Sequence, residues 1–338
     1  EKTKEPSFTQ NWLINNKNKI AQLIVSAREI NKFHGTFLSS IMRYQVDGRI
    51  HGEINQLRGD NGGTVSGRLS MSNPNLQQVP ARNKDFGPKI RSLFVPEEGY
   101  KWGSFDYSQQ EPRMTVHYAA SIGDGYEGSN ELVEAYQNAS ADFHQTVADL
   151  VGIERTQAKT IGLGLMYGMG KNKLAISLGV TKDEADELIV KYNKKVPFIK
   201  KLSDRCKYAA DEKGVIRTKK GRKCRFDLWE TRDFGLHIAE KYEDAVAKYG
   251  KDNIKRAYTY KALNRLIQGS SADQTKQSML DCYNAGHLPM LQIHDELCFN
   301  VKDDNHAQQI KNIMQESIKF KVPSVVEYGL GESWGDAK

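Results

Sequence analysis

The segment LQIHDELCFN, residues 291–300, sets three ionisable side chains into an otherwise strand-forming run. Apolar residues on both sides favour two short strands, so His294, Asp295 and Glu296 are predicted at the turn of a hairpin. Neighbouring carboxylates repel each other, which is unfavourable unless a positive charge lies close. Asp and Glu are also common in solvated turns. On this stretch alone, an exposed turn and a cation-binding site are equally good interpretations.

A second carboxylate follows another strand-like run. Residues 100–105, YKWGSF, are typical of a strand that ends at Asp106, and DYSQQE then leads into a predicted helix. An Asp at such a boundary is commonly a helix N-cap. Paired with Asp295 at the end of an adjacent strand, however, Asp106 provides the ligands that Mg²⁺ needs, because this ion takes oxygen ligands and usually one or two carboxylates.

Strand-like segments lie toward both ends of the chain, and helical periodicity dominates between them. Together they predict an α+β fold in which distant segments build one sheet. The predicted helices are 8–45, 107–120, 131–137, 142–151, 154–167, 182–194, 197–213, 253–284 and 304–318. The predicted strands and hairpins are 46–65, 100–106, 212–227, 289–301 and 323–330, and 72–98 is predicted as polar loops.

Composition excludes several classes of protein. The 338 residues suggest about two domains or subdomains. The absence of a run of about 18 apolar residues predicts no membrane-spanning helix. The four cysteines contain no CxxC pair, which argues against zinc and against a disulfide scaffold and fits a reducing compartment. A net charge of +7 indicates only weakly a polyanionic partner.

A helical stripe in RTQAKTIGLGLMYGMG carries two cations and an aromatic ring. Arg155, Lys159, Leu163 and Tyr167 recur every four residues and so lie along one side of a helix. Arg and Lys at this spacing suit a triphosphate, and Tyr167 suits stacking on a base; a solvated charged face with a core tyrosine is the alternative. Each glycine in a helix costs about 1 kcal/mol relative to alanine, so crowded glycines indicate close backbone approach or a moving helix. The glycines here are Gly162, Gly164, Gly168 and Gly170.

The segments DYSQQEPR, RTQAKTIGLGLMYG and QIHDELCF resemble motifs A, B and C of family A DNA polymerases, the bacterial polymerase I group and its phage relatives. SGRLSMSNPNLQQVPAR resembles the stretch before motif A, and ALNRLIQGSSAD resembles the helix before motif C. The resemblance extends from about Arg28 to the end of the chain. It implies a right-hand fold with an antiparallel palm sheet, mostly helical fingers and a partial thumb. The implied domains are thumb remnant 1–45, palm 46–111 and 255–338, and fingers 112–254.

The resemblance also implies a catalytic centre. Asp106 and Asp295 would bind two Mg²⁺ ions, which Mn²⁺ can replace, with the carbonyl of Tyr107 as a further ligand and Glu296 beside them. Such ions lower the pKa of the primer 3′-hydroxyl and neutralise the leaving pyrophosphate. Lys159 would contact the triphosphate and donate a proton to the pyrophosphate.

Further roles are implied around the nucleotide and the DNA. Glu111 would be the steric gate that excludes a ribose 2′-hydroxyl. The other implied nucleotide contacts are Arg155 at the γ-phosphate, His144 at the β-phosphate, Lys159, Leu163, Tyr167 and Gln109. Arg68 and Gln268 would read minor-groove acceptors, Asn264 and His294 would line the primer terminus and duplex, and Arg28 and Lys32 would lie along the duplex near the thumb.

The chain departs from the family pattern at several positions. Leu163 stands where bacterial members carry Phe or Tyr and viral members can carry Leu, which suggests a viral origin and altered discrimination against dideoxynucleotides. Tyr260 stands where relatives often have an arginine. The short segment 1–45 predicts a truncated thumb, low processivity and no proofreading in this chain. An upstream exonuclease or thumb region, or a replisome protein, is then a further partner beside primer–template DNA and dNTPs.

The resulting prediction is a template-directed DNA polymerase of the cytoplasm of a bacterial or virus-infected cell, without a membrane partner. Three alternatives remain: a single-subunit RNA polymerase, a catalytically dead DNA-binding relative and a two-metal nuclease. Glu111 and Glu296 argue against an RNA polymerase. A catalytically dead relative would not need to retain the residues implied in catalysis, which are Asp106, Asp295, Arg155 and Lys159. A nuclease has no need for a triphosphate-binding stripe.

Overall fold

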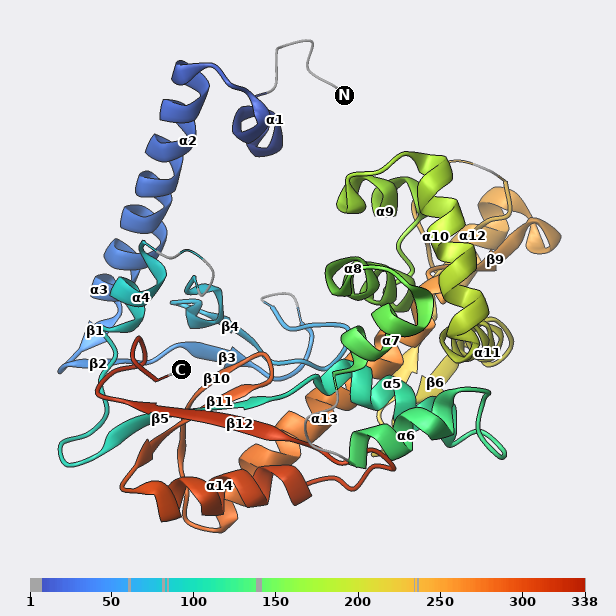
Figure 1. Cartoon of the computed structure of the whole chain (residues 1–338). Coiled ribbons are helices and arrows are strands. Elements are labelled where there is room, and N and C mark those ends of the chain that lie inside the picture. Colours follow the sequence, from blue (N-terminus) through green and yellow to red (C-terminus); the bar gives the residue numbers. More distant parts are fainter. Residues whose placement is uncertain are drawn as a thin grey trace.

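The computed structural model describes residues 8–59, 62–80, 83, 85–137, 142–233, 235 and 237–337. At its centre is a four-stranded antiparallel sheet with the strand order β10-β11-β5-β12 (Figure 1). The sheet joins one strand from the first third of the chain to three strands near its end, which confirms the predicted α+β arrangement. The strands are β5 (Lys101–Tyr107), β10 (Pro289–Ile293), β11 (Glu296–Val301) and β12 (Val326–Gly331).

The two faces of this sheet differ because side chains alternate along a strand. Phe105, Leu297 and Phe299 point to one face and are buried in a core with residues of α13 (Ala262–Asn284) and α14 (Asp304–Glu316). Asp106 lies directly opposite Glu296 in the β5–β11 register and therefore shares the other face. The helices thus anchor the sheet from one side and leave the carboxylates on the other.

The N-terminal segment forms a helical arm, as the periodicity predicts. Helix α2 stands away from the sheet (Figure 1). Phe33 and Phe37, directly after α2, are buried in a core with Trp102 and so attach the arm to the rest of the molecule. Ile20 and Leu23 remain exposed on α2. The arm contains α1 (Gln10–Asn15), α2 (Lys19–Lys32), a π-helical stretch (Phe33–Leu38) and α3 (Ser39–Arg43). Short antiparallel pairs follow: β1 (Gln45–Val46) with β2 (Arg49–Ile50), and β3 (Glu53–Asn55) with β4 (Ser70–Ser72).

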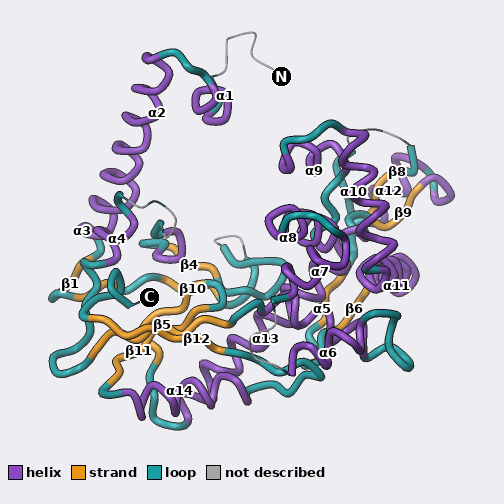
Figure 2. The backbone as a smooth tube through the Cα atoms, in the orientation of Figure 1, coloured by secondary structure: helices purple, strands orange, loops and turns teal. Residues whose placement is uncertain are grey.

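A second, mostly helical part lies at the other end of the sheet, where the tube in Figure 2 shows helices gathered around few strands. Buried residues such as Val147, Ile161 and Tyr192 join its helices into one large core. The helices are α5 (Gln110–Ala120), α6 (Ser129–Gln137), α7 (Phe143–Val151), α8 (Arg155–Met166), α9 (Lys171–Leu178), α10 (Lys182–Lys195) and α11 (Pro197–Lys213). Helix α9 is an addition to the predicted set.

Two predictions of local structure were wrong in part. The helix predicted from residue 253 begins only at Ala262, because β9 (Ile254–Arg256) pairs with β8 (Trp229–Thr231) and a 3-10 turn follows. Pairing with a distant strand here overrides the local helical pattern. The polar stretch 72–98 contains a 3-10 turn and α4 (Gly87–Arg91) as well as loops.

The basic hairpin predicted over 212–227 is confirmed. It consists of β6 (Val215–Arg217) and β7 (Lys223–Arg225). Helix α12 (Tyr242–Tyr249) completes the elements. Within the described ranges, no helix combines the length and the apolar character needed to cross a membrane.

Candidate active site

The carboxylates meet at the ends of three neighbouring strands. Asp106 is flanked by Glu296 on β11 and by Glu327 on β12. Asp295 lies in the two-residue turn between β10 and β11, where His294 takes a φ of 56°. Side chains that are distant in the sequence therefore share the open face of the sheet, as the pairing of Asp106 with Asp295 predicts.

This crowding changes the proton affinity of the two aspartates. The pKa of Asp106 is raised to about 7, first by desolvation and then by the negative charges of Asp295, Glu296 and Glu327. The pKa of Asp295 is also raised, mainly by burial, with Glu111 adding to the effect and Arg68 opposing it. A bound cation would relieve the repulsion between these carboxylates, so the strand ends are a candidate cation site.

Glu111 lies at the centre of a second network. It stands in the first turn of α5, and its carboxylate accepts hydrogen bonds from Arg68 at 2.5 Å and from the hydroxyl of Tyr167. Burial and the Glu111 charge raise the pKa of Tyr167, and the charge of Asp295 also contributes. The network thus connects the loop that carries Arg68, the start of α5 and the end of α8. It lies next to Asp295.

The start of α8 presents the predicted cations. Arg155 donates to the Asp142 carboxylate from Nε at 2.8 Å and lies 2.6 Å from it through its terminal nitrogen. Asp142 also caps α7, accepting from the backbone N–H groups of His144 and Gln145. Burial raises the pKa of Asp142, but the hydrogen bond from Arg155 and the helix N–H groups outweigh it, so the net pKa is lowered.

His144 lies beside these cations and is buried. Its pKa is lowered to about 4, mainly by burial; the charge of Asp142 opposes this shift, and the charges of Lys159 and Arg155 add to it. Its Nδ1 atom is buried without a hydrogen-bond partner in the described part of the chain. Gln109 fixes the start of α7, because its side-chain oxygen accepts from the N–H of Phe143 at 2.9 Å. The structure therefore gathers Arg155, Lys159 and His144 as predicted.

Comparison with known proteins identifies this arrangement. The family model for DNA polymerase family A matches residues 1–336. This chain belongs to DNA polymerase family A. It is 38% identical to a DNA-directed DNA polymerase of Pseudomonas phage M6, over 98% of this chain and 54% of that protein. It is 30% identical to DNA polymerase I of Geobacillus stearothermophilus, over 95% of this chain and 35% of that protein.

A solved family A structure has the same fold. The POL domain of Pol1 from M. smegmatis, in complex with DNA primer-template and dNTP, matches with a TM-score of 0.77 and 27% identity. The match covers 97% of this chain and 55% of that chain. The family A chain described here therefore spans about half the length of the phage relative and of the Pol1 chain.

Family A polymerases use divalent metal ions, generally Mg²⁺, and the strand-end residues fit such an ion. Among the described residues, no group of three or more His, Cys, Asp or Glu side chains is arranged to hold a metal. Two crowded carboxylates nevertheless suffice for Mg²⁺, because it keeps several waters and takes its other ligands from substrate phosphates. Asp106 and Asp295, whose pKa values are raised, are the residues that fit this role.

The crowded glycines of α8 have a packing reason in this family A chain. A Cβ atom at Gly162 would lie 2.8 Å from the Tyr192 hydroxyl, and one at Gly164 would lie 3.1 Å from a methyl carbon of Leu174. Gly168 has a φ of 66°, a conformation that other residues rarely adopt. Close approach of neighbouring helices to α8, one of the two predicted reasons, accounts for both helical glycines.

The predicted DNA contacts are spread more widely. Asn264 and Gln268 lie half-buried on α13, and His294 is exposed at the hairpin turn. Arg28 and Lys32 lie on α2, which stands away from the sheet (Figure 1), and Arg28 donates to the carbonyl of Phe8 at 2.9 Å. The structure therefore does not bring these last two residues to the carboxylates.

Two charged neighbours of the site were not predicted from the sequence. Glu327 lies opposite Asp106, and Asp142 holds Arg155. Asp142 carries a weak signal, because an Asp before a helical run is a typical N-cap. The position of Glu327 depends on the register of β12 against β5, for which the sequence offers no signal.

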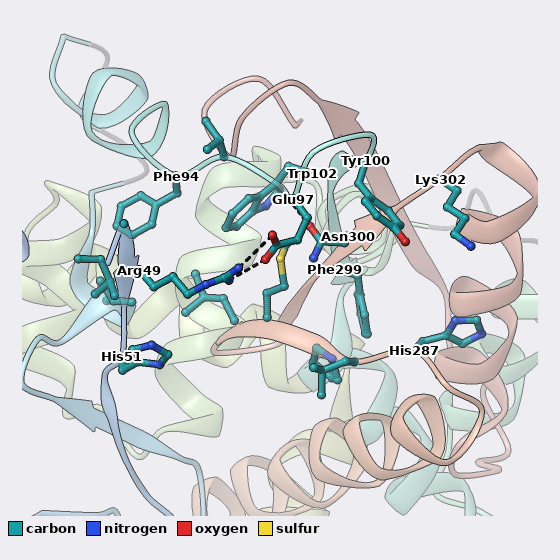
Figure 3. Close-up of a pocket in the computed structure, with 18 of the residues that line it drawn as sticks. Arg49, His51, Phe94, Glu97, Tyr100, Trp102, His287, Phe299, Asn300 and Lys302 are labelled. Carbon is teal, nitrogen blue, oxygen red and sulfur yellow. Dashed lines mark hydrogen bonds and ion pairs between the residues drawn. The ribbon is translucent and has the colours of Figure 1, made fainter. Parts of the chain in front are cut away.

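A large cavity lies elsewhere on the molecule. Its volume is about 1130 Å³, and it lies between the β1–β2 hairpin, residues 93–97 and the turn at 286–290. Figure 3 shows Arg49 and Glu97 paired at this cavity, with a contact of 2.6 Å. None of the predicted site residues lines it. The strand-end carboxylates, with perturbed pKa values and neighbouring cations, are the better candidate for chemistry.

The Arg155–Asp142 ion pair leads to a kinetic prediction. Asp142→Asn keeps an N-cap for α7 but releases Arg155. If Arg155 binds a triphosphate, as the family resemblance implies, the KM for dNTP should fall about 2- to 5-fold, because an exposed ion pair is worth up to about 1 kcal/mol. The kcat should be unchanged in single-nucleotide incorporation assays. Asp186→Asn, which breaks the similar Lys171–Asp186 pair, is the control. A raised KM would instead show that Asp142 holds Arg155 ready for the triphosphate.

Proposed function

We propose that this chain is the polymerising part of a template-directed DNA polymerase that adds deoxynucleotides to a primer 3′-hydroxyl. The observation that carries this proposal is the position of the Arg68–Glu111–Tyr167 network next to Asp295. The network connects a nucleotide-selecting group to the carboxylates that would hold the metal. The named relatives, a DNA-directed DNA polymerase and DNA polymerase I, support the same activity.

Asp106 and Asp295, with the backbone carbonyl of Tyr107, would hold the divalent ions, two in number if the family pattern applies. When bound, Mg²⁺ supplies positive charge that favours ionisation of the 3′-hydroxyl and neutralises the leaving pyrophosphate. Mn²⁺ could take the same oxygen ligands.

The cations of α8 would bind and orient the triphosphate. Arg155 offers a planar fork to the γ-phosphate, and Lys159 would donate a proton to the leaving pyrophosphate. His144, whose pKa is lowered to about 4, is neutral near pH 7 and so would offer one ring N–H to the β-phosphate. Gln109 would border the nucleotide and hold the start of α7 in place.

The remaining roles follow the same proposal. Glu111 would exclude the ribose 2′-hydroxyl, and Tyr167 would lie beside the template base. The DNA contacts would be Arg68, Gln268, Asn264 and His294 near the primer terminus, and Arg28 and Lys32 along the duplex. The proposed domains are thumb 1–45, palm 46–111 with 255–338, and fingers 112–254. The cytoplasm of a bacterial or phage-infected cell, with primer–template DNA, dNTPs and an upstream exonuclease or replisome partner, is the proposed setting.

Primer extension tests the proposal. A labelled primer–template with Mg²⁺ and dNTPs should be extended by the wild type and not by Asp295→Ala, whereas rNTPs should be used poorly. Circular dichroism and DNA binding of the variant serve as controls for folding. If folded, DNA-binding wild-type protein adds no nucleotide, the proposed activity of this chain is wrong.

Leu163 offers a separate test of nucleotide selection. It is partly buried and packs against the core of the helical part, so it presents an aliphatic surface in place of a ring. We expect Leu163→Phe to change the ratio of dNTP to ddNTP incorporation, measured by competition on one template. Leu165→Phe, at a partly buried position two residues further along the same helix, is the control. Equal ratios in wild type and Leu163→Phe would contradict the expectation.

A further inference from the structure

Trp334, near the C-terminal end, contacts the β10–β11 hairpin. Trp334 is buried, with 1% of its surface exposed, and its indole Nε1–H donates to the carboxylate of Glu296 at 3.3 Å. Its ring stacks on Trp102 at 6.0 Å between centroids and 20° between planes. Its backbone N–H donates to the carbonyl of Phe94 at 2.9 Å. The indole is thus fixed on several sides and its N–H is aimed at Glu296.

A cation accompanies this contact. The guanidinium carbon of Arg91 lies 4.2 Å from the centroid of the Trp334 ring. Arg91 is partly buried, and its Nε atom has no hydrogen-bond partner in the described part of the chain. Burial lowers the pKa of Arg91, and the negative charge of Glu296 opposes this effect. Arg91 therefore supplies positive charge on the side of Glu296 that faces the C-terminal segment.

These contacts also define the direction in which the Glu296 side chain points. Its Oε1 atom, which accepts from Trp334, also accepts from the thiol of Cys298 at 3.4 Å. Cys298 stands two residues further along β11 on the same face, away from the turn that carries Asp295. The Glu296 carboxylate therefore lies back along its strand, although its backbone is paired directly with Asp106.

We propose that Trp334 is a positioning residue that holds the Glu296 carboxylate away from the strand ends and so leaves the divalent ion to Asp106 and Asp295. The inference rests on the metal site of the proposed function. A third carboxylate at that site would hold the ion more tightly and compete with the substrate phosphates for it, because both supply hard oxygen ligands. Removing the indole N–H should free Glu296 to do so.

Direct metal binding tests this role. Mn²⁺ binding to the DNA-free protein is measured by electron paramagnetic resonance in wild type, Trp334→Phe, Glu296→Gln and the double variant. Phe keeps an aromatic ring beside Trp102 but removes the N–H donor, together with part of the ring volume. Trp334→Phe should bind Mn²⁺ about tenfold more tightly, because the free energy of a hydrogen bond to a charged group corresponds to a change in affinity of about this size. The double variant should bind like Glu296→Gln. Unchanged binding in Trp334→Phe, or a change that persists in the double variant, overturns the proposal.

A measurement on the unmodified protein covers the case in which Trp334→Phe does not fold. The indole ¹H–¹⁵N resonance of Trp334 should keep its position when Mg²⁺ is added, because Glu296 stays bound to the indole. A shift that reports loss of this hydrogen bond on adding Mg²⁺ overturns the proposal. Asp106→Asn separates the two hypotheses. If it binds Mn²⁺ like the wild type, the metal site of the proposed function is wrong, and the role of Trp334 is wrong with it.

Discussion

Asp106→Asn should abolish templated nucleotide addition and at the same time raise the melting temperature of the protein in metal-free buffer. The loss should reach at least about 10³-fold, because metal-bound charge contributes several kcal/mol to phosphoryl transfer and each 1.36 kcal/mol is tenfold in rate. The melting temperature should rise because Asp106 lies opposite Glu296 and Glu327 in the sheet, and the charge of Asp295 adds to their repulsion. Removing one carboxylate relieves this repulsion.

The measurement is thermal unfolding in EDTA at pH 8, beside single-nucleotide incorporation in Mg²⁺. We expect the melting temperature of Asp106→Asn to rise by at least about 2 °C, and Mg²⁺ to stabilise the wild type more than the variant. Glu327→Gln is the matched control, because it neutralises an exposed carboxylate beside Asp106 that the proposed mechanism does not use. It should raise the melting temperature and retain activity. Full activity in Asp106→Asn would remove this residue from the metal site.

Glu111→Ala should lower the discrimination between dNTP and rNTP by about 10- to 100-fold, which corresponds to about 1.4–3 kcal/mol. The Glu111 side chain is 12% exposed and is held from two sides by Arg68 and Tyr167. A side chain fixed in this way cannot move aside easily for a 2′-hydroxyl. Its removal opens that space and leaves the strand-end carboxylates in place.

Glu111→Gln separates bulk from charge in this prediction. Gln has the same size but weakens the ion pair with Arg68, so a steric role predicts that it keeps most of the discrimination. The measurement is kcat/KM for one dNTP and its rNTP counterpart in wild type and both variants. Equal loss in Gln and Ala would show that the Arg68–Glu111–Tyr167 network, rather than the volume of the side chain, selects the sugar.

The local elements of the candidate site were predictable from the sequence. The hairpin 289–301, the strand ending near Asp106 and the helix from Arg155 were predicted, and the structure confirms them. Alternating or helical apolar residues record which side of each element is buried, so these patterns are legible within a few residues. The motifs in the same segments indicated the family, which the comparisons confirm.

The tertiary structure decided which side chains of these elements meet. The sequence does not reveal that β9 pairs with β8, that Glu327 lies opposite Asp106, or that Asp142 holds Arg155. The contact between Trp334 and Glu296 likewise joins the C-terminal segment to the hairpin. Each of these contacts depends on strand register or on packing between remote elements, and a shift of one residue would turn the side chain to the other face. The sequence therefore determined the elements and their chemistry, whereas long-range packing determined how their charges are paired.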